Sequence, residues 1–290
     1  MRTEKEMMNL IIDLAKSDDR ILAAYLKGSR TNPNVPKDRY QDFDVMYVVT
    51  ETHSFIQDTS WINHFGTVVL MQEQDTDFGY GSRFHIQSHY EEGYSWLLLF
   101  DDGNRIDIGI ELLPVMKSGR NRNKLFLPLL DKTGCLPQLP PPTDEDFTIQ
   151  KPSNKNFLGC CNEFFWCLCD VAKGIARDEL PFAMTTYYTL VREMLEQMLD
   201  WYIGINTDYS VSSGKLRKYL KKYLPTEFYE AYKKIYSDGD YDHLWVSIYT
   251  ACQLFRETAL LVAQHFHFVY PEQEDQASQN YIRRIQASIQ

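Results

Sequence analysis

Three acidic residues on two short apolar segments have the spacing of a metal-binding site. Asp42 and Asp44 flank Phe43 at the start of an apolar run, and Asp107 is the one charge in Ile-Asp-Ile-Gly-Ile. Side chains at positions i and i+2 of a β-strand share a face, so both carboxylates of the pair would point one way and Phe43 into the core. Neighbouring carboxylates repel each other unless a cation lies between them, and Mg²⁺ prefers carboxylates combined with substrate phosphates.

A Gly-Ser pair precedes these acids by about a dozen residues. Gly28 and Ser29 follow an apolar stretch, and a tight glycine turn can offer backbone amides and a hydroxyl group to a phosphate. If the segment of Asp107 lies beside that of Asp44, the three carboxylates converge near this turn, as two-metal phosphoryl or nucleotidyl transfer requires. Singly, each feature is ordinary, because Gly-Ser forms turns and Asp-x-Asp occurs at solvated strand ends and helix caps. The combination of the Gly-Ser pair, the Asp-x-Asp pair and the later isolated Asp favours a phosphate and metal site over ordinary structural roles.

The elements that would position these residues alternate between helix and strand. Helical spacing of apolar residues predicts a helix over 4–17. Short apolar runs predict strands at 21–26, 43–49, 67–71, 94–100 and 105–112. The last two flank Asp-Asp-Gly-Asn, which is typical of a β-hairpin turn. We expect a mixed β-sheet in this part of the chain.

The pattern changes at a proline-rich segment. Four prolines between 137 and 142 cannot continue a helix or a central strand, so we expect a domain over 1–136 and a semi-rigid linker over 137–150. Beyond it, amphipathic helices are predicted at 157–177, 181–205, 214–223, 227–236 and 241–267. The predicted fold class is α+β, with a mixed-sheet domain followed by an all-α helical bundle over 151–290.

The charge of the chain limits its partners. Its 40 Asp and Glu residues outnumber its 30 Lys and Arg residues, which gives a net charge of -10. A nucleic-acid partner is therefore not expected, whereas a small cationic partner suits the acidic surface. No apolar run approaches the length of a membrane span, and the acidic N-terminus does not resemble a signal peptide. We expect a cytoplasmic monomer without a membrane partner.

The residues around these motifs resemble a known family. Gly28-Ser29-Arg30, the Asp42 to Asp44 motif, LLLFDDGNRIDIGI, NEFFWCLCDVAKGIARDEL and GKLRKYLKKYLP are similar to segments of the aminoglycoside 6-adenylyltransferases, which belong to the nucleotidyltransferase superfamily. The resemblance extends over nearly the whole chain. It implies Mg²⁺-dependent transfer of AMP from ATP to a hydroxyl group of streptomycin, with release of pyrophosphate. It also implies that Ser29 contacts the phosphates, that Asp42 and Asp44 bind metal, and that Asp107 is a third ligand or the general base.

Further residues would complete the two substrate sites. Basic side chains suit a triphosphate, and the resemblance favours Arg192 and Lys215 of the helical region. The predicted nucleotide-binding residues are Gly28, Ser29, Arg30, Lys173, Arg192 and Lys215. Acidic and aromatic side chains suit a cationic antibiotic, and the predicted residues are Glu92, Trp96, Asp178 and Glu179. Each of these residue types is also common on solvated helix faces, on surfaces or in cores.

Two other functions are compatible with the sequence. The basic cluster that begins at Lys215 would also suit an RNA backbone, so a nucleotidyltransferase acting on RNA or protein is one alternative. A catalytically silent nucleotide-binding protein of the same fold is the other. The presence of all three acids argues against the second alternative, and the overall acidity argues against the first.

Overall fold

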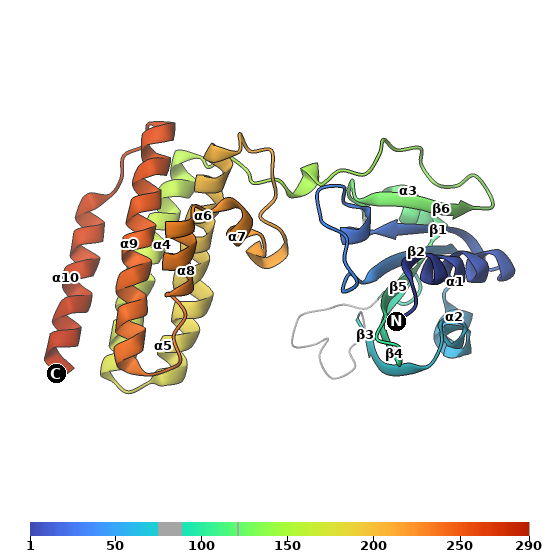
Figure 1. Cartoon of the computed structure of the whole chain (residues 1–290), viewed down its shortest axis with the longest axis horizontal. Coiled ribbons are helices and arrows are strands. Elements are labelled where there is room, and N and C mark those ends of the chain that lie inside the picture. The colour runs from blue at the N-terminus through green and yellow to red at the C-terminus, as the bar shows by residue number, and fades with distance from the viewer. Residues whose placement is uncertain (75–88, 121, 290) are drawn as a thin grey trace. The chain divides into compact units, whose positions relative to one another are not determined.

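The computed structural model describes residues 1–74, 89–120 and 122–289. The chain forms two units, Met1–Asp146 and Phe147–Gln290, each with its own hydrophobic core (Figure 1). The division falls within the segment 137–150 that the prolines mark as a linker. The structure thus assigns most of that segment to the first unit.

The first unit is built on a six-stranded sheet with the order β3-β4-β5-β2-β1-β6. The strands are β1 (Ile21–Lys27), β2 (Phe43–Val49), β3 (Val68–Glu73), β4 (Gly93–Phe100), β5 (Arg105–Leu112) and β6 (Phe126–Asp131). β2 and β5 pair in parallel, and the other neighbours pair antiparallel, so the sheet is mixed as predicted. β6 was not among the predicted strands, because Pro128 argues against a strand. Proline is tolerated there because β6 is an edge strand.

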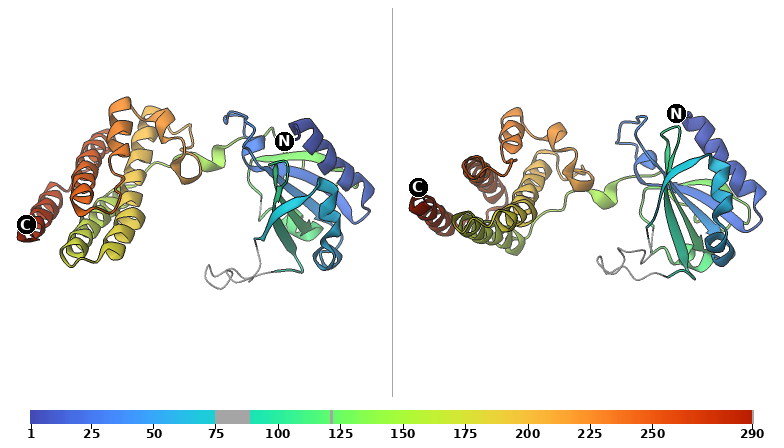
Figure 2. Two further views of the ribbon diagram at one scale, coloured as in Figure 1. Left: turned by 60° about the horizontal axis from the view of Figure 1, so that its bottom comes forward. Right: turned by 90° about the horizontal axis from the view of Figure 1, so that it is seen from below.

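Apolar residues on alternate positions give the sheet two buried faces. Phe43 and Tyr47 of β2 pack in one core with Met7 and Ile11 of α1 (Glu4–Ser17). The hydroxyl group of Tyr47 donates a hydrogen bond to the carbonyl oxygen of Ile11 at 2.8 Å. The opposite face, which includes Met46, packs in a smaller core. Figure 2 shows α1 lying along one side of the sheet.

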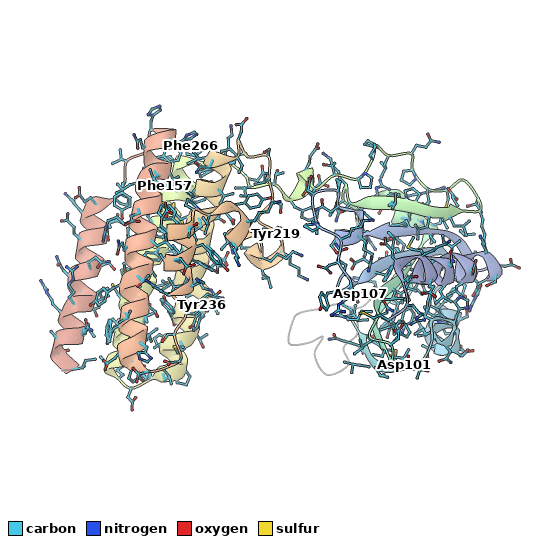
Figure 3. All side chains as sticks on the ribbon, in the orientation of Figure 1. Asp101, Asp107, Phe157, Tyr219, Tyr236 and Phe266 are labelled. Atoms are coloured by element: carbon cyan, nitrogen blue, oxygen red, sulfur yellow. The ribbon has the colours of Figure 1, made fainter. Side chains whose placement is uncertain are left out.

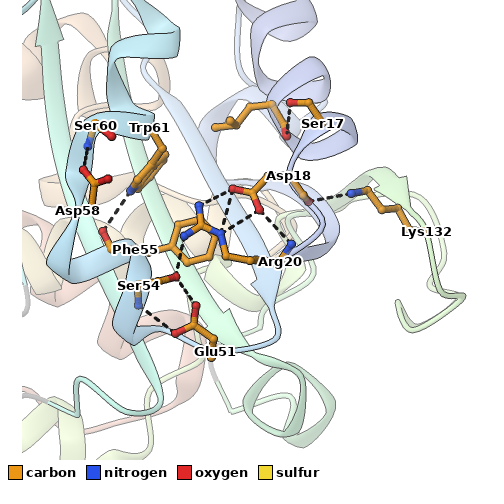
Figure 4. Close-up of polar contacts among 11 residues, drawn as sticks. Ser17, Asp18, Arg20, Glu51, Ser54, Phe55, Asp58, Ser60, Trp61 and Lys132 are labelled. Atoms are coloured by element: carbon orange, nitrogen blue, oxygen red, sulfur yellow. Dashed lines mark hydrogen bonds and ion pairs between the residues drawn. The ribbon is translucent and has the colours of Figure 1, made fainter.

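Short helices complete the first unit. They are η1 (Gly28–Thr31), α2 (His53–Gln57), η2 (Thr59–Phe65) and α3 (Leu113–Ser118), and η4 (Glu145–Phe147) spans the boundary between the units. Arg20, just before β1, ties the sheet to α2 (Figure 4). Its guanidinium group pairs with Asp18 at 2.5 Å, donates to the hydroxyl oxygen of Ser54 at 2.6 Å and lies 3.8 Å from the centre of the Phe55 ring. This network fixes the start of β1. The turn at Gly28 lies at the other end of the same strand.

The second unit is a bundle of helices around one core. They are α4 (Asn154–Ala176), α5 (Leu180–Thr186), the π-helical η5 (Tyr187–Val191), α6 (Arg192–Asn206), η6 (Lys215–Arg217), α7 (Leu220–Tyr223), α8 (Thr226–Lys233), α9 (Tyr241–Phe266) and α10 (Glu272–Ile289). The α+β fold class, a mixed sheet followed by a helical bundle, is therefore confirmed.

Two helix predictions in the bundle need correction. The segment 214–223 is not one helix, because Gly214 and Leu216 have positive φ values of 78° and 54° and only a short η6 and α7 form around them. α10, which begins directly after Pro271, was not among the predicted helices. In the described part of the chain, no helix is both long and apolar enough to cross a membrane.

Candidate active site

The strand register brings the predicted acids together at one end of the sheet. Asp44 of β2 pairs with Asp107 of β5 in the parallel ladder and with Lys27 of β1 on its other side. Asp42 lies two residues before Asp44, immediately ahead of β2. Residues in register project from the same face, and the strand of Asp107 does lie beside that of Asp44, as convergence of the carboxylates requires. Figure 3 labels Asp107 at this end of the sheet.

Gly28 allows the turn after β1 to lie directly against Asp44. Its φ of 73° is in the left-handed region, and a Cβ atom at this position would lie 2.2 Å from Oδ2 of Asp44. Only glycine fits such an approach without displacing the carboxylate. The hydroxyl group of Thr31 donates to the carbonyl oxygen of Gly28 at 2.9 Å and closes the turn. The Gly28-Ser29 turn and the Asp44 carboxylate therefore form one compact feature.

Arg30 holds the backbone that leads into β2 beside this feature. Its Nε donates to the carbonyl oxygen of Asp42 at 3.0 Å, its Nη2 donates to that of Gln41 at 2.5 Å, and its guanidinium carbon lies 3.6 Å from the centre of the Phe43 ring. The residue is only 9% exposed. Burial lowers the pKa of Arg30, although Glu4 and Asp42 oppose this effect. Two of its donors thus serve the backbone that carries the acids, and the nucleotide-binding role of Arg30 stays a prediction.

Arg105, which was not among the predicted site residues, lies between two of the acids. Its Nη1 is 3.4 Å from Oδ2 of Asp42, and its Nη2 is 3.6 Å from Oδ1 of Asp107. Its position two residues before Asp107 on β5 was the available signal, since the two side chains must share a face. Arg105 therefore reduces the repulsion between the carboxylates.

The donor set fits Mg²⁺, although the protein does not form a complete cage for it. Carboxylate oxygens are the hard ligands that Mg²⁺ prefers, and one or two of them usually suffice when substrate phosphates supply the rest. Within 1–74, 89–120 and 122–289, no group of three His, Cys, Asp or Glu side chains is placed to hold a metal ion on its own. Asp42, Asp44 and Asp107 are thus suited to a site that substrate completes.

A buried acid lies further along the same strand. Glu111 is four residues beyond Asp107 on β5 and is only 3% exposed. The hydroxyl group of Tyr25 on β1 donates a hydrogen bond to its Oε1 at 2.6 Å. Burial raises the pKa of Glu111, and the hydrogen bond from Tyr25 opposes the rise. This pair links β1 to β5 next to the site. Neither residue was among the predicted site residues.

Two predicted antibiotic-binding residues of the first unit have different surroundings. Trp96 is 1% exposed and packs in the core, with its ring centre 5.2 Å from that of Trp61 and 4.6 Å from that of Tyr94. The prediction that Trp96 binds substrate is therefore wrong, because no ligand can reach a fully covered ring. Glu92 is only partly buried and forms an ion pair with Arg120.

The predicted residues of the helical unit are distributed over both of its ends. Lys173, Asp178 and Glu179 lie near the C-terminal end of α4, which is about 34 Å long at 1.5 Å per residue. The loop before Lys215 lies at the other end, where the amide of Ile149, just before α4, donates to the carbonyl oxygen of Val211 at 3.0 Å. Lys173 and Lys215 therefore cannot bind one triphosphate together, which corrects that grouping.

The remaining predictions at the far end of α4 have local partners. Lys173 pairs with Asp170 at 2.5 Å, and this contact raises the pKa of Lys173. Oδ1 of Asp178 accepts a hydrogen bond from the hydroxyl group of Tyr241 at 2.9 Å. Asp178 and Glu179 form the link between α4 and α5. Their contacts are those of a helix-connecting turn.

Two arginines organise the side of α6. The Nε of Arg192 lies 3.3 Å from Glu196, and its guanidinium group lies over the rings of Tyr188 and Tyr236 at 5.0 and 5.3 Å. Arg217 extends from the basic segment that begins at Lys215 to three carboxylates of α6. It pairs at 2.8, 3.2 and 2.9 Å with Glu193, Glu196 and Asp200, respectively. These contacts fix the loop that carries Lys215 to α6.

The chain is similar to known proteins over nearly its whole length. Residues 1–285 match the family model described as streptomycin adenylyltransferase. An aminoglycoside 6-adenylyltransferase of Campylobacter jejuni is 36% identical over 98% of this chain and 96% of that protein. One from Bacillus subtilis strain 168 is 34% identical over the full length of both. One from Staphylococcus aureus is 31% identical over 98% of each.

A solved structure from the same group is also similar. It is described as an aminoglycoside 6-adenyltransferase from Bacillus subtilis, is 29% identical, covers 98% of this chain and 99% of that one, and has a TM-score of 0.48. The sequence match extends from the acidic site through the helical unit to residue 285. The chain belongs to the streptomycin adenylyltransferase family.

Proposed function

We propose that this protein transfers AMP from ATP to a hydroxyl group of an aminoglycoside, with streptomycin as the preferred acceptor, and so confers resistance to the antibiotic. The observation that carries the proposal is the register that pairs Asp44 with Asp107 and packs Asp44 against Gly28. The curated relatives support it, since each is named as an aminoglycoside 6-adenylyltransferase. The transfer also releases pyrophosphate.

The residues of the first unit would have separate roles in the transfer. Asp42 and Asp44 would hold Mg²⁺, with Asp107 as a third ligand or as the proton acceptor for the attacking hydroxyl group. Bound Mg²⁺ would neutralise negative charge on the phosphates of ATP. The Gly28-Ser29 turn, fixed against Asp44, would orient the phosphates for in-line attack. Arg30 would keep the backbone of Gln41 and Asp42 in place.

Basic residues of the helical unit are proposed to contact the nucleotide. Lys215 is the strongest candidate, because Arg217 fixes its loop through three ion pairs and leaves the lysine on an exposed segment. Arg192 is the second candidate, although it already contacts Glu196 and two tyrosine rings. Glu92 remains a candidate for the cationic antibiotic, since a charged ligand could compete for it with Arg120.

A transfer assay with labelled ATP tests this function. The purified protein is incubated with Mg²⁺ and ATP labelled at the α-phosphate, in parallel with streptomycin, with tRNA and without an acceptor. We expect label only on streptomycin, together with one pyrophosphate per AMP transferred. Label on tRNA or on the protein itself would favour a different acceptor class. Binding of ATP without transfer to any acceptor would indicate a silent nucleotide-binding protein.

A further inference from the structure

Asp144, near the end of the first unit, accepts hydrogen bonds from the loop that follows the Gly28-Ser29 turn. Its Oδ1 accepts from Nδ2 of Asn34 at 2.7 Å, and its Oδ2 accepts from Nδ2 of Asn32 at 3.1 Å. The two contacts join residues that are 110 and 112 positions apart in the sequence. All three residues belong to the unit Met1–Asp146, so the contacts do not depend on the placement of the helical unit.

Asp144 is a buried carboxylate that relies on neutral donors. The residue is only 8% exposed, and no Lys, Arg or His side chain within 1–74, 89–120 and 122–289 forms an ion pair with it. Burying a carboxylate is costly unless its oxygens are hydrogen-bonded. The side-chain amides of Asn32 and Asn34 supply those bonds, one to each oxygen. The carboxylate in turn gives both side chains a fixed position.

The two donors directly follow the turn that is predicted to hold phosphate. The backbone amide of Asn32 donates to the carbonyl oxygen of Ser29 at 3.2 Å and ends η1. Oδ1 of Asn32 accepts from the backbone amide of Asn34 at 2.9 Å. Asn32 therefore connects the carboxylate of Asp144 to the backbone of Ser29. A displacement of Asn32 would shift the turn that Gly28 allows to lie against Asp44.

The segment that carries Asp144 is itself attached to the sheet. The backbone amide of Thr143 donates to the carbonyl oxygen of Lys124 at 3.2 Å. The backbone amide of Lys124 donates to Oδ2 of Asp146 at 2.7 Å. Lys124 lies just before β6, and β6 pairs with β1, which leads into Gly28. The turn is thus fixed by β1 at its start and by Asp144 after its end.

We propose that Asp144 is a positioning residue for ATP, which holds the Gly28-Ser29 turn in the geometry that binds the phosphates. The inference rests on the proposed function, which assigns the phosphates of ATP to this turn. Exact placement matters there, because a displacement of about 1 Å can lower a rate about a hundredfold. The role of Asp144 differs from that of Asp42, Asp44 and Asp107, because its charge faces the loop and touches neither metal nor substrate.

Calorimetric titration of the full-length protein with ATP and Mg²⁺, without antibiotic, tests the inference. Asp144→Asn keeps the size of the side chain but leaves one acceptor oxygen for two amide donors, so the Kd for ATP should rise about tenfold. The KM for ATP should rise to the same extent, whereas the Kd and KM for streptomycin should not change. Asp38→Asn is the matched control, because it changes an exposed carboxylate of the same loop, which accepts from the amide of Tyr40.

A charge swap separates a lost contact from a damaged fold. Asn34→Asp alone places two carboxylates face to face and should also weaken ATP binding. When it is combined with Asp144→Asn, the new amide can donate to the new carboxylate while its oxygen still accepts from Asn32. The net charge of this double variant equals that of the wild type. We expect it to recover most of the ATP affinity that each single variant loses.

Three results would overturn the inference. The first is an unchanged ATP affinity in Asp144→Asn. The second is a loss of affinity that the double variant does not recover. The third is an equal loss of ATP and streptomycin binding together with a lower Tm, since a general loss of structure affects both substrates.

The outcomes for the inference and for the proposed function are distinguishable. A wild-type protein that binds ATP in a manner that depends on Asp144 but transfers no AMP to streptomycin would contradict the proposed function alone. A wild-type protein that transfers AMP, with the same ATP affinity in Asp144→Asn, would contradict the inference alone. A wild-type protein that does not bind ATP would contradict both.

Discussion

Arg30 is a buried charge whose contacts hold the backbone of the candidate site. Its two backbone hydrogen bonds and its contact with Phe43 all involve the residues that precede or begin β2. Asp42 and Asp44 therefore depend on a guanidinium group that solvent hardly reaches. The planar arrangement of its donors is needed to reach two neighbouring carbonyl oxygens at once, and lysine cannot reproduce it.

We predict that Arg30→Lys lowers kcat and stability while leaving the KM for ATP nearly unchanged. The loss of two charge-assisted hydrogen bonds should reduce the free energy of unfolding by about 2 kcal/mol or more. Steady-state kinetics and chemical unfolding would measure the two effects. Arg39→Lys, in the exposed part of the same loop, is the control. A large rise in the KM for ATP with unchanged stability would instead indicate a phosphate ligand.

Among single residues, the sequence identified those whose place in the site follows from a local pattern. Asp44 and Asp107 stand out because each interrupts an apolar strand, and strand alternation is a property of a few neighbouring residues. The burial of Trp96 could not be predicted in the same way, because its cover comes from Trp61 and other distant residues. The bridging position of Arg105 likewise requires the register between β2 and β5.

At the scale of elements, the parallel pairing of β2 with β5 is the feature that creates the site. The hairpin of β4 and β5 was predictable from its turn signal, and the existence of β1 and β2 was predictable from their apolar runs. Which strands lie side by side is a non-local property that periodicity does not report. The predicted helix over 214–223 failed for another reason, since the ion pairs of Arg217 stabilise left-handed residues that helix propensity disfavours.

The pair of Tyr25 and Glu111, which links β1 to β5 across β2, gives stability a pH dependence. Burial raises the pKa of Glu111 in the folded state above its value in the unfolded state. The stabilisation of the folded state that comes from this difference is fully present below the unfolded pKa, and it is lost as the pH rises through the folded pKa. We predict that Glu111→Gln, which can still accept the hydrogen bond from Tyr25, raises the Tm at pH 8 and has little effect near pH 4.

Thermal unfolding between pH 4 and pH 8 checks this prediction. Glu91→Gln, an exposed neighbour of β4, should show no such dependence. A Glu111→Gln variant that is less stable than the wild type at pH 8 would mean that the hydrogen bond from Tyr25 to the carboxylate outweighs the cost of burial.

At the scale of the whole molecule, the net charge of -10 is unevenly distributed. Acidic side chains lie at the ends of β2 and β5 and along α6, whereas basic residues cluster in the segment 215–222. The excess of acids therefore favours a cationic acceptor, and the basic segment suits a triphosphate. Part of the attraction for the antibiotic should arise from this overall field as well as from direct contacts.

We predict that streptomycin binding weakens as salt is added. Raising KCl from 50 to 300 mM shortens the Debye length to below about 8 Å and screens the acidic surface, so the Kd should increase several-fold. Calorimetric titrations without ATP isolate this effect from the charge of the nucleotide. An affinity that does not change with salt would show that the acidic surface contributes little to antibiotic binding.

The most direct test of the central claim is pyrophosphate release by Asp44→Asn and by the wild type, with ATP, Mg²⁺ and streptomycin. The substitution keeps the size of the side chain and removes its charge, so the protein should fold normally and lose activity at least about a hundredfold. Asp19→Asn, at an exposed position before β1, should behave like the wild type. Near-normal pyrophosphate release by Asp44→Asn would contradict the assignment of this carboxylate to the metal and phosphate site.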